Sequence, residues 1–360
     1  MNVLVFSKYS TLGASSRVRI AQYTSILLQN HGVSLQFQCL FSNRYLQKKY
    51  NKKLIAHVIV AAYFRRILSL LHLRIFSNKY DVILVEKEFF PYLPFCFERL
   101  LTGSNLRYVV DFDDAIFHNY DKHPSAIIRG ILSKKIPHVV KNSCHVICGN
   151  RYLESMFVKF RAKQVTVIPS VIDNELYPQF PVVKVKVKTI GWIGSPSTFK
   201  YIKPLLPLLS DFCCSNSLHL LIVGSGCNYP LMKNVIWSDW SQGKELELLG
   251  RMDIGLMPLF DGPFELGKCG YKLIQYMAAG VIPIASPVGA NLDIIDQGAT
   301  GFFASSPHDW INAIKEILSM TVPERSLLIN NGVNQVSKKY SIISREALLF
   351  DVLFSNRIDD

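Results

Sequence analysis

The chain has 360 residues, of which 49% are hydrophobic and 19% charged, and its formal net charge is +13. This composition excludes a disordered chain, and the length suggests two domains of about 150 residues each. No apolar run reaches the roughly 20 residues that a helix needs to span a bilayer. The charge is concentrated at one end: the first 80 residues carry 12 basic and no acidic side chains, whereas the other 280 carry 28 basic and 27 acidic ones. This end predicts a partner rich in negative charge, namely a nucleic acid, an anionic membrane or a phosphorylated substrate.

The first half of the chain alternates short apolar runs with helical patterns. A helix is expected at about residues 16–30, and strands are expected at residues 3–6, 33–39, 82–85, 108–110, 145–148 and 165–168. The expected strands are continuously apolar, which is typical of parallel strands that helices cover on both faces. This alternation predicts a doubly wound sheet.

The pattern restarts after a proline-containing segment near residues 170–185. Strands are expected at 185–193, 219–223, 253–257 and 282–285, and helices from about 198 and at 271–279, 307–319 and 343–354. The predicted fold is α/β, with two Rossmann-like doubly wound domains that face a cleft. We expect an amino-terminal domain at 1–175 with a basic helical insertion at 44–80, a carboxy-terminal domain at 176–340, and a final helix at 341–360 that packs on the amino-terminal domain.

The insertion at 44–80 holds nine basic residues and no acidic one. This composition fits an ordinary pair of surface helices that pack on the sheet. It also fits a membrane-surface element that is attracted to anionic lipid. The absence of acidic residues favours the second interpretation. Nucleic acid is not expected as a partner, because the basic residues are not interleaved with aromatic ones as in nucleic-acid-binding modules. The residues predicted to face the membrane are Lys48, Lys49, Lys52, Lys53, Arg65 and Arg66.

The eight cysteines show no paired CxxC spacing of the kind that holds zinc. Most of them lie in apolar, strand-like runs. We therefore expect reduced core residues, which are typical of a cytoplasmic protein.

The turn after the first strand contains small residues followed by arginine. In a doubly wound domain this turn lies at the carboxyl end of the sheet, where small residues let the backbone approach a phosphate. Gly13, Ser15, Ser16 and Arg17 are therefore candidate phosphate ligands. Arg17 and Arg19 point to different sides of a helix, so only one of them is expected to face the crevice. Alternatively, Ser15 or Ser16 simply caps the helix.

Three carboxylates, Asp111, Asp113 and Asp114, follow the strand expected at 108–110. Carboxylates beside a buried strand are costly unless they are paired or functional. One of them is expected to cap the next helix, and Asp113 and Asp114 are candidate catalytic residues. Asp111 and Asp113 have the DxD spacing of a metal site, but the second domain offers another way to hold a phosphate, so no metal is expected.

That alternative is the segment from Gly267 to Lys272, which leads into a helix. Two glycines and two lysines at a helix start suit a diphosphate. Lys268 and Lys272 are four residues apart and share one helical face if both are helical. Glycines at 191, 194, 224 and 226 follow other strand ends, and the convergence of these loops on one crevice is more specific than any single loop.

The region 251–304 contains the motifs Asp253-Ile-Gly-Leu-Met-Pro258, Gly267-Lys268, Lys272-Leu-Ile-Gln-Tyr-Met-Ala-Ala-Gly280, Ser286-Pro-Val-Gly289 and Gly301-Phe302. With these motifs it resembles the carboxy-terminal domain of glycosyltransferase family 4, which has the GT-B fold. The segments at 111–116, 149–153, 167–169 and 191–198 resemble a branch of that family seen in bacterial surface-polysaccharide and lipopolysaccharide synthesis. The resemblance covers nearly the whole chain.

The resemblance implies a retaining transfer of a sugar from a nucleotide sugar to a glycan or lipid-linked acceptor. The donor would bind the second domain and the acceptor the first, without a metal or other cofactor, at the inner face of the cytoplasmic membrane. Asp113, Asp114 and Lys268 are the expected catalytic residues. The expected donor-binding residues are Gly13, Ser15, Ser16, Arg17, Gly194, Ser195, Glu265, Lys268, Lys272, Gln275 and Gly289.

The chain departs from the family at its paired glutamates. Gly267 and Gln275 occupy these two places, of which the second normally holds the donor ribose. Glutamine still forms hydrogen bonds there, with less charge assistance, and Glu265 is a candidate replacement for the first. These departures motivate an alternative function, a catalytically weak GT-B module that binds a glycan or a protein partner.

A second departure concerns the phosphate charge. Trp192 and Ser197 stand roughly where the family has an arginine and a lysine. Lys268 and Lys272 are therefore expected to supply the missing positive charge.

Overall fold

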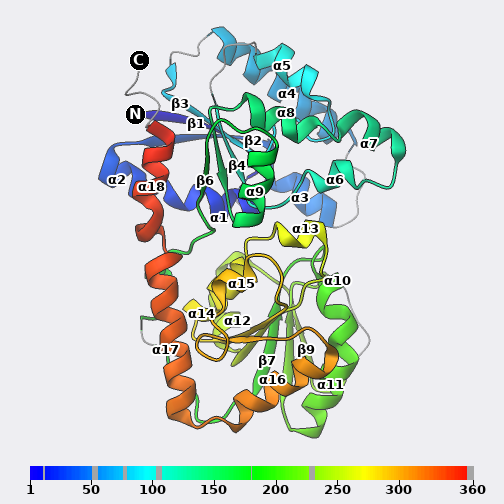
Figure 1. Ribbon diagram of the computed structural model, residues 1–360, viewed down its shortest axis with the longest axis vertical. Coiled ribbons are helices and arrows are strands. Elements are labelled where there is room, and N and C mark those ends of the chain that lie inside the picture. Colours follow the sequence, from blue (N-terminus) through cyan, green and yellow to red (C-terminus); the bar gives the residue numbers. More distant parts are fainter. Residues whose placement is uncertain are drawn as a thin grey trace. The chain divides into compact units, whose positions relative to one another are not determined.

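The computed structural model of the chain describes residues 1–10, 13–50, 56–75, 79–102, 108–179, 181–226 and 232–354. The chain forms two compact units, each of which is a parallel sheet covered by helices (Figure 1). The first unit comprises Met1–Ser170, Leu266–Cys269 and Arg345–Asp360, and the second comprises Val171–Glu265 and Gly270–Ser344. The predicted fold class, α/β with two Rossmann-like doubly wound domains, is confirmed.

The sheet of the first unit has six parallel strands in the order β2-β1-β3-β4-β5-β6. They are β1 (Asn2–Tyr9), β2 (Ser34–Phe41), β3 (Val82–Glu86), β4 (Val109–Phe112), β5 (His145–Cys148) and β6 (Val165–Val167). The helices are α1 (Ala14–Arg19), α2 (Thr24–His31), α3 (Asn43–Tyr50), α4 (Ala56–Ile75), α5 (Phe95–Thr102), α6 (His118–Asp121), α7 (Ala126–Leu132), α8 (Lys135–Asn142) and α9 (Arg151–Lys159).

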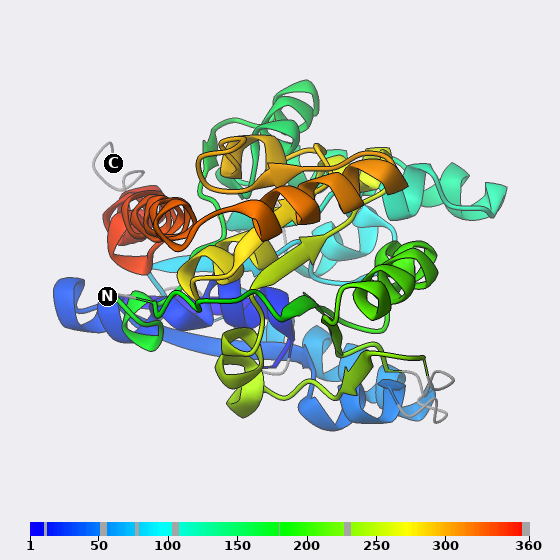
Figure 2. The ribbon, with the colours of Figure 1, turned by 90° about the horizontal axis from the view of Figure 1, so that it is seen from below.

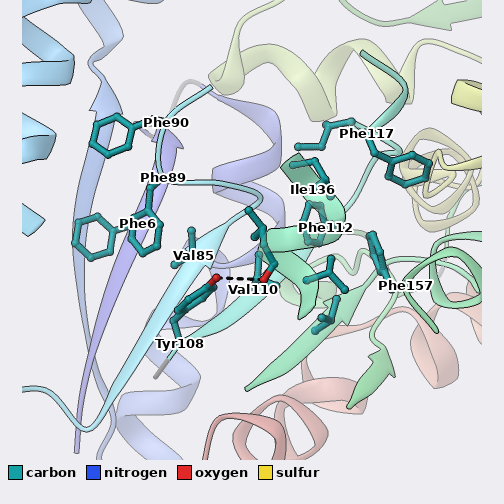
Figure 3. Close-up of a cluster of buried hydrophobic side chains, with 14 of the residues drawn as sticks. Phe6, Val85, Phe89, Phe90, Tyr108, Val110, Phe112, Phe117, Ile136 and Phe157 are labelled. Atoms are coloured by element: carbon teal, nitrogen blue, oxygen red, sulfur yellow. Dashed lines mark hydrogen bonds between the residues drawn. The ribbon is translucent and has the colours of Figure 1, made fainter. Parts of the chain in front are cut away.

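Aromatic side chains fill one side of this sheet (Figure 3). Phe89 packs edge to face against Phe6 at 5.2 Å and against Tyr108 at 5.6 Å between ring centroids. The Tyr108 hydroxyl donates a hydrogen bond to the Val139 carbonyl at 3.1 Å, which satisfies the one polar atom that this ring buries. Consecutive residues of β1, Val3 to Phe6, are all buried, so both faces of the sheet are covered, which explains the continuously apolar strands.

Helix α18 (Ile342–Phe354) lies beside α2 in both views of the ribbon (Figures 1 and 2). The Asn30 side-chain amide donates to both Glu346 carboxylate oxygens at 2.9 and 3.0 Å, and the His31 ring stacks on Phe350 at 4.1 Å between centroids. From Arg345 onward the chain therefore packs with the first unit.

The sheet of the second unit also has six parallel strands, in the order β12-β11-β10-β7-β8-β9. They are β7 (Thr189–Ile193), β8 (His219–Val223), β9 (Val235–Ser238), β10 (Ile254–Met257), β11 (Ile282–Ala285) and β12 (Phe302–Phe303). The helices are α10 (Phe199–Ile202), α11 (Leu206–Ser215), α12 (Glu245–Gly250), α13 (Pro263–Leu266), α14 (Tyr271–Ala278), α15 (Asn291–Ile294), α16 (Pro307–Ser319) and α17 (Val322–Lys339).

Each sheet has a point where the strand order reverses, between β1 and β3 in the first unit and between β7 and β10 in the second. Ligands of doubly wound sheets bind outside the carboxyl ends of the strands at such a switch point. Most of the predicted site residues follow one of these strands, so the fold places them at the edge where ligand binding is expected.

Several elements differ from expectation. The strand expected at 185–193 begins at Thr189, because the Arg325 guanidinium of α17 binds the Lys184 and Val185 carbonyls in place of a neighbouring strand. The helix expected at 16–30 is divided at Ile20. The sequence did not predict β9, β12 or α17, although α17 starts with a capping box of Thr321 and Glu324.

The domain boundary expected after residue 175 lies after Ser170, and the inclusion of residues 266–269 in the first unit was not foreseen. Cys39 and Cys96 are exposed, which contradicts the expectation that the cysteines are core residues; Cys39 lies on the edge strand β2. Cys227 is outside the described residues. Among the helices that the structure describes, none is long and apolar enough to cross a membrane.

Candidate functional site

The carboxyl ends of β1 and β3 are joined by a buried carboxylate. The Ser16 hydroxyl donates to Glu86 Oε2 at 2.6 Å, and the Lys8 backbone N–H donates to the same oxygen at 3.0 Å. Burial raises the pKa of Glu86, and the Lys87 charge and the Ser16 hydrogen bond offset part of this effect. A carboxylate at the switch point repels phosphate.

This arrangement disfavours the phosphate contacts predicted for the first turn. Gly13 and Ser16 are buried, Ser15 and Arg17 are half-buried, and the Ser16 hydroxyl is engaged by Glu86. The alternative, a serine cap, is wrong: Gly13 is the N-cap of α1, and no side chain caps it.

Lys87, directly after β3, contacts a carboxylate and a hydroxyl group. Its ammonium lies 2.6 Å from Asp113 Oδ1 and donates to the Ser15 hydroxyl at 3.2 Å. Lys87 has a positive φ of 68°, a conformation that a non-glycine residue adopts only where its surroundings hold it. Burial alone lowers the pKa of Lys87, but the carboxylates of Asp113, Asp114 and Glu86 raise it above its usual value.

Asp113 and Asp114 differ in their electrostatics although they are neighbours. Burial raises the pKa of Asp113, but the Lys87 charge and the hydrogen bonds from Lys87 and Ser15 lower it to about 2. Burial also raises the pKa of Asp114, and the Lys268 ammonium, 3.8 Å away, offsets only part of that rise. The Asp114 side chain is 30% exposed and that of Asp113 only 13%, so Asp114 is the more accessible of the two.

Asp111 has a different role. Arg19 Nη2 and Nε bind its two oxygens at 2.6 and 3.1 Å, and Arg19 Nη1 donates to the Ile168 carbonyl at 2.7 Å. Both side chains are almost fully buried, so this ion pair joins α1 to β4 and is not open to a ligand. The prediction that one of the three carboxylates caps the next helix is wrong, because the N-cap of α6 is Phe117 and has no side-chain hydrogen bond.

The segment 266–269 belongs to the first unit, where hydrogen bonds from side chains to backbone carbonyls hold it. Asn150 Nδ2 donates to the carbonyls of Leu266 and Lys268 at 3.1 and 3.0 Å, while its Oδ1 caps α9. The Cys269 thiol donates to the Asp113 carbonyl at 2.7 Å, and a Cβ at Gly149 would lie 2.0 Å from Cys269 Sγ. These contacts bring Lys268 beside Asp114.

In the second unit, the turn after β7 is held by short polar contacts. Gly194 donates its N–H to the Val223 carbonyl at 3.0 Å, and the Ser195 N–H donates to Thr198 Oγ1 at 2.9 Å. The Trp192 ring packs so close to Gly194 that a Cβ there would lie 2.3 Å from it. The Lys272 ammonium lies 5.4 Å from the centroid of Trp192. Trp192 thus connects the predicted donor residues Gly194 and Lys272.

Helix α14 begins at Tyr271, so Lys268 precedes the helix and does not share a helical face with Lys272. Lys268 also belongs to the first unit, whereas Lys272 belongs to the second. The expected single clamp is therefore two separate cations, one in each unit.

Gln275 lies on α14 and is 3% exposed. Its Nε2 finds no hydrogen-bond partner among the described residues, whereas buried polar groups are usually satisfied. Its neighbour Tyr276 is fully buried: the Tyr276 hydroxyl accepts from the Ile193 N–H at 3.1 Å and donates to the Leu256 carbonyl at 3.2 Å. Helix α14 is thereby fixed to β7 and β10, on either side of the switch point.

Two further predicted donor residues lie in other loops of the second unit. Glu265 is buried and accepts from the Tyr201 hydroxyl at 2.6 Å, and the Lys200 ammonium lies 3.7 Å from the same oxygen. Gly289 lies in the turn after β11, which Asn291 holds by a hydrogen bond from Nδ2 to the Ser286 carbonyl at 2.9 Å.

The residues predicted to face a membrane have different positions. Arg66 is buried, and its guanidinium donates to the Ser7 and Gln38 carbonyls at 2.8 and 3.0 Å, so its predicted exposure to lipid is wrong. Arg65 is exposed and Lys48 is half-buried. Lys52 and Lys53 lie outside the described residues, as does the side chain of Lys49.

Sequence reasoning missed Lys87, Asn150 and Trp192 as parts of the site. Lys87 follows the end of β3, as Asp113 follows the end of β4, and that position was an available signal. No cluster of three His, Cys, Asp or Glu side chains that could hold a metal occurs in the part of the chain that the structure describes.

The chain was compared with protein families, curated proteins and solved structures. Residues 187–320 match the family model described as glycosyl transferases group 1. No curated protein sequence matches the chain.

Solved structures match over nearly the full length. Sucrose-phosphate synthase from Thermosynechococcus elongatus is 14% identical with a TM-score of 0.71, and the match covers 99% of this chain and 100% of that one. HepE from Anabaena in complex with UDP-glucose is 13% identical with a TM-score of 0.67, at 99% and 100% coverage. WaaG, a glycosyltransferase involved in lipopolysaccharide biosynthesis, is 14% identical with a TM-score of 0.64, at 98% and 100% coverage. At these identities the likeness establishes the two-domain GT-B fold.

Proposed function

We propose that the chain is a glycosyltransferase that uses a nucleotide-sugar donor and retains the anomeric configuration. The match of residues 187–320 to the group 1 family model and the GT-B fold support this proposal. The acceptor is a glycan or lipid-linked glycan of bacterial polysaccharide or lipopolysaccharide synthesis. The second unit holds the donor, and the first unit holds the acceptor.

The observation that carries the proposal is the state of Gln275. It is a buried amide with an unsatisfied Nε2 on α14, the helix whose Tyr276 is hydrogen-bonded to β7 and β10 on either side of the switch point. A buried donor without a partner costs about 1–3 kcal/mol, which a ligand hydroxyl removes by accepting a hydrogen bond. The ribose of a nucleotide sugar offers such hydroxyls, and the Lys272 charge suits the diphosphate beside it.

The proposed reaction breaks the bond between the anomeric carbon and the donor phosphate oxygen. The acceptor hydroxyl oxygen attacks that carbon on the same face, and its proton passes to the departing phosphate oxygen. No protein nucleophile is needed. Lys272 would stabilise the charge on the leaving diphosphate in the second unit, and Asp114, beside Lys268 in the first unit, would orient the acceptor. The proposal invokes no metal.

The named relatives support the substrate class. HepE is described in complex with UDP-glucose, and WaaG with lipopolysaccharide biosynthesis. By analogy with them we assign a nucleotide sugar as donor and a surface glycan or its lipid-linked precursor as acceptor. A lipid-linked acceptor would place the protein at the inner face of the cytoplasmic membrane.

A thermal-shift screen with UDP, GDP and other nucleotides tests donor binding, because a ligand that binds only the folded state raises the unfolding temperature. Mass-detected transfer from a panel of activated sugars then tests the reaction. Absence of any nucleotide binding would overturn the enzymatic proposal and favour a binding module.

Substitutions at the two lysines test the charge assignment. Lys272→Ala should lower transfer at least about 100-fold, the effect of losing one transition-state donor, without changing the unfolding temperature greatly. Lys268→Ala should also lower transfer, because Asp114 loses the ammonium that lies 3.8 Å from it. Lys315→Ala, at an exposed lysine of the same unit as Lys272, is the matched control and should retain activity. Retained activity in Lys272→Ala would remove this lysine from the diphosphate site, and retained activity in Lys268→Ala would show that its contact with Asp114 is not needed for transfer.

A further inference from the structure

Helix α4 carries an apolar row on the side that faces away from its own domain. The row consists of side chains that are 41–74% exposed: Val60, Phe64, Leu68, Leu71 and Ile75. Their spacing of three or four residues places all five within about 80° of arc at 3.6 residues per turn. A helix at a domain surface normally has polar residues on this side, so the row is an unusual exposed apolar surface.

The opposite side of α4 is anchored in the first unit. Ala62, Arg66, Leu70 and Leu73 are buried there, and Arg66 ties the helix to the Ser7 and Gln38 carbonyls. The guanidinium of Arg66 also lies 4.9 Å from the centroid of the Phe6 ring. Helix α4 packs beside α5 (Figure 1), on which Phe97 is 51% exposed. The apolar row is thus held in a fixed outward orientation.

The charged side chains of α4 itself are all positive. Arg65 and Arg74 are exposed and flank the row on its two sides, and His57 and His72 are exposed on the same helix. Helix α4 contains no acidic residue, and the first acidic residue of the chain is Asp81. A protein partner would meet this surface with acidic side chains around an apolar patch, but nothing in the row provides polar groups for specific pairing. An anionic bilayer offers both a negative surface and a hydrocarbon layer.

We infer that α4 is an interfacial membrane helix that inserts Val60, Phe64, Leu68, Leu71 and Ile75 into the headgroup and acyl boundary of an anionic bilayer, while Arg65 and Arg74 bind lipid phosphates. The helix lies in the plane of the membrane, with its apolar side about 5–10 Å deep. This inference rests on the proposed function only for its purpose, which is to bring the acceptor unit to a lipid-linked acceptor. It adds insertion by apolar side chains to the predicted contact by the lysines near residue 50, and it omits Arg66, which is buried.

Vesicle sedimentation of the full chain tests the inference. Wild-type protein should bind vesicles of phosphatidylcholine mixed with phosphatidylglycerol. The double variant Phe64→Gln/Leu68→Gln should bind them at least about tenfold more weakly, because each side chain loses its apolar burial. Arg65→Gln/Arg74→Gln should weaken binding by about tenfold at low salt and by less at high salt. Val158→Gln, at a valine that is 61% exposed on α9, is the matched control and should bind as wild type.

Insertion depth is read separately. Trp placed by Phe64→Trp should be quenched by brominated lipid, whereas Trp placed by Val158→Trp should not. Vesicle binding of Phe64→Gln/Leu68→Gln equal to that of wild type, or no quenching in Phe64→Trp, would overturn the inference. Self-association of the wild type without lipid that the double variant abolishes would also overturn it, in favour of a dimer contact.

Nucleotide binding allows the membrane inference and the proposed function to be tested independently. The thermal shift caused by nucleotide should be the same in Phe64→Gln/Leu68→Gln and in wild type, because α4 lies in the unit that is not proposed to hold the donor. Loss of vesicle binding with an intact nucleotide response supports the membrane helix. Absence of a nucleotide response in the wild type speaks against the proposed function and leaves the vesicle result unaffected.

Discussion

The Lys87 ammonium lies 2.6 Å from Asp113 Oδ1, and this contact separates two neighbouring carboxylates into different electrostatic states. Asp113 is held as an anion with a pKa of about 2, whereas burial raises the pKa of Asp114. Groups pushed apart in this way often divide their roles at a reaction centre. We therefore assign Asp113 a structural role and Asp114 the contact with the substrate.

Replacing Lys87 should destabilise the first unit. Lys87→Met leaves the buried carboxylates of Asp113 and Glu86 without their cation, at a cost of about 3–5 kcal/mol. The folded pKa of Asp113 is lowered, so its stabilising contribution is present above its unfolded pKa of about 3.9 and is lost as the pH falls toward 2. The difference between variant and wild type in urea unfolding should therefore shrink as the pH falls from about 4 toward 2. Lys87→Arg should lose less, and a difference independent of pH would contradict this account.

The pH dependence of transfer should follow Asp114. If ionised Asp114 binds the acceptor, activity falls as the pH drops through its raised pKa, and Asp114→Asn should remove this acidic limb and lower kcat about 100-fold. Asp113 titrates too low to produce the limb. An acidic limb that persists in Asp114→Asn would exclude Asp114 as its source.

A glutamate in place of Gln275 should strengthen donor binding and lower the stability of the unliganded protein. Gln275→Glu should bind the nucleotide donor about fivefold more tightly, because a hydrogen bond to a charged acceptor exceeds a neutral one by about 1 kcal/mol. The unliganded variant should be less stable by about 1–3 kcal/mol, since it buries a carboxylate without a partner. Isothermal calorimetry and urea unfolding measure the two effects. Gln275→Ala should bind the donor more weakly than wild type, and equal affinity in all three forms would show that Gln275 does not contact the donor.

A buried cluster beyond the site should make stability pH-dependent. Lys135 Nζ lies 2.6 Å from Glu88 and 3.0 Å from Glu98, and burial raises the pKa of Glu98 to about 7. Because this folded pKa exceeds the unfolded one, stability falls as the pH rises from about 4.5 to about 7, by up to roughly 3 kcal/mol. Glu98→Gln should flatten the dependence of unfolding free energy on pH in this window. An unchanged slope in the variant would assign the dependence to another group.

The absence of a side chain at Gly149 should be required for residues 266–269 to pack in their observed position. A Cβ in Gly149→Ala would meet Cys269 Sγ at 2.0 Å, so the segment must shift and expose the thiol. Reaction of Cys269 with a thiol reagent should become faster than in wild type. Gly130→Ala is the matched control on α7, where a Cβ meets no atom within 4 Å, and it should leave thiol reactivity unchanged. A reaction in Gly149→Ala no faster than in wild type would mean that other contacts hold the segment in place.

The sequence predicted the sheets well and the site only in part. Apolar runs such as 219–223 and 282–285 gave strand bounds that match β8 and β11, because burial on both faces leaves a clear pattern. The roles of Ser16, Arg19 and Arg66 were not predictable, because each depends on a partner far away in the chain: Glu86, Asp111 and Gln38. Local spacing does not contain this information.

The outward side of α4 was not foreseen for a related reason. A helical wheel separates basic from apolar residues, but it does not say which side packs on the sheet. The buried side has Arg66 at its centre, and the exposed side has Phe64 and Leu68. A long arginine that satisfies strand carbonyls can thus occupy the inner face, whereas apolar side chains occupy the outer one.

The Tyr276 hydroxyl couples the spacing of β7 and β10 to the position of α14. The ladder between β7 and β10 is short, with Ile190 opposite Ile254 and Gly191 opposite Gly255, and beyond it the Tyr276 hydroxyl bridges Ile193 and Leu256. The separation of the two strands is therefore set by the side chain of a residue adjacent to Gln275. Any ligand that spreads or narrows this gap must also displace the helix that carries Gln275, so the edge of the sheet and the Gln275 side chain can only move together.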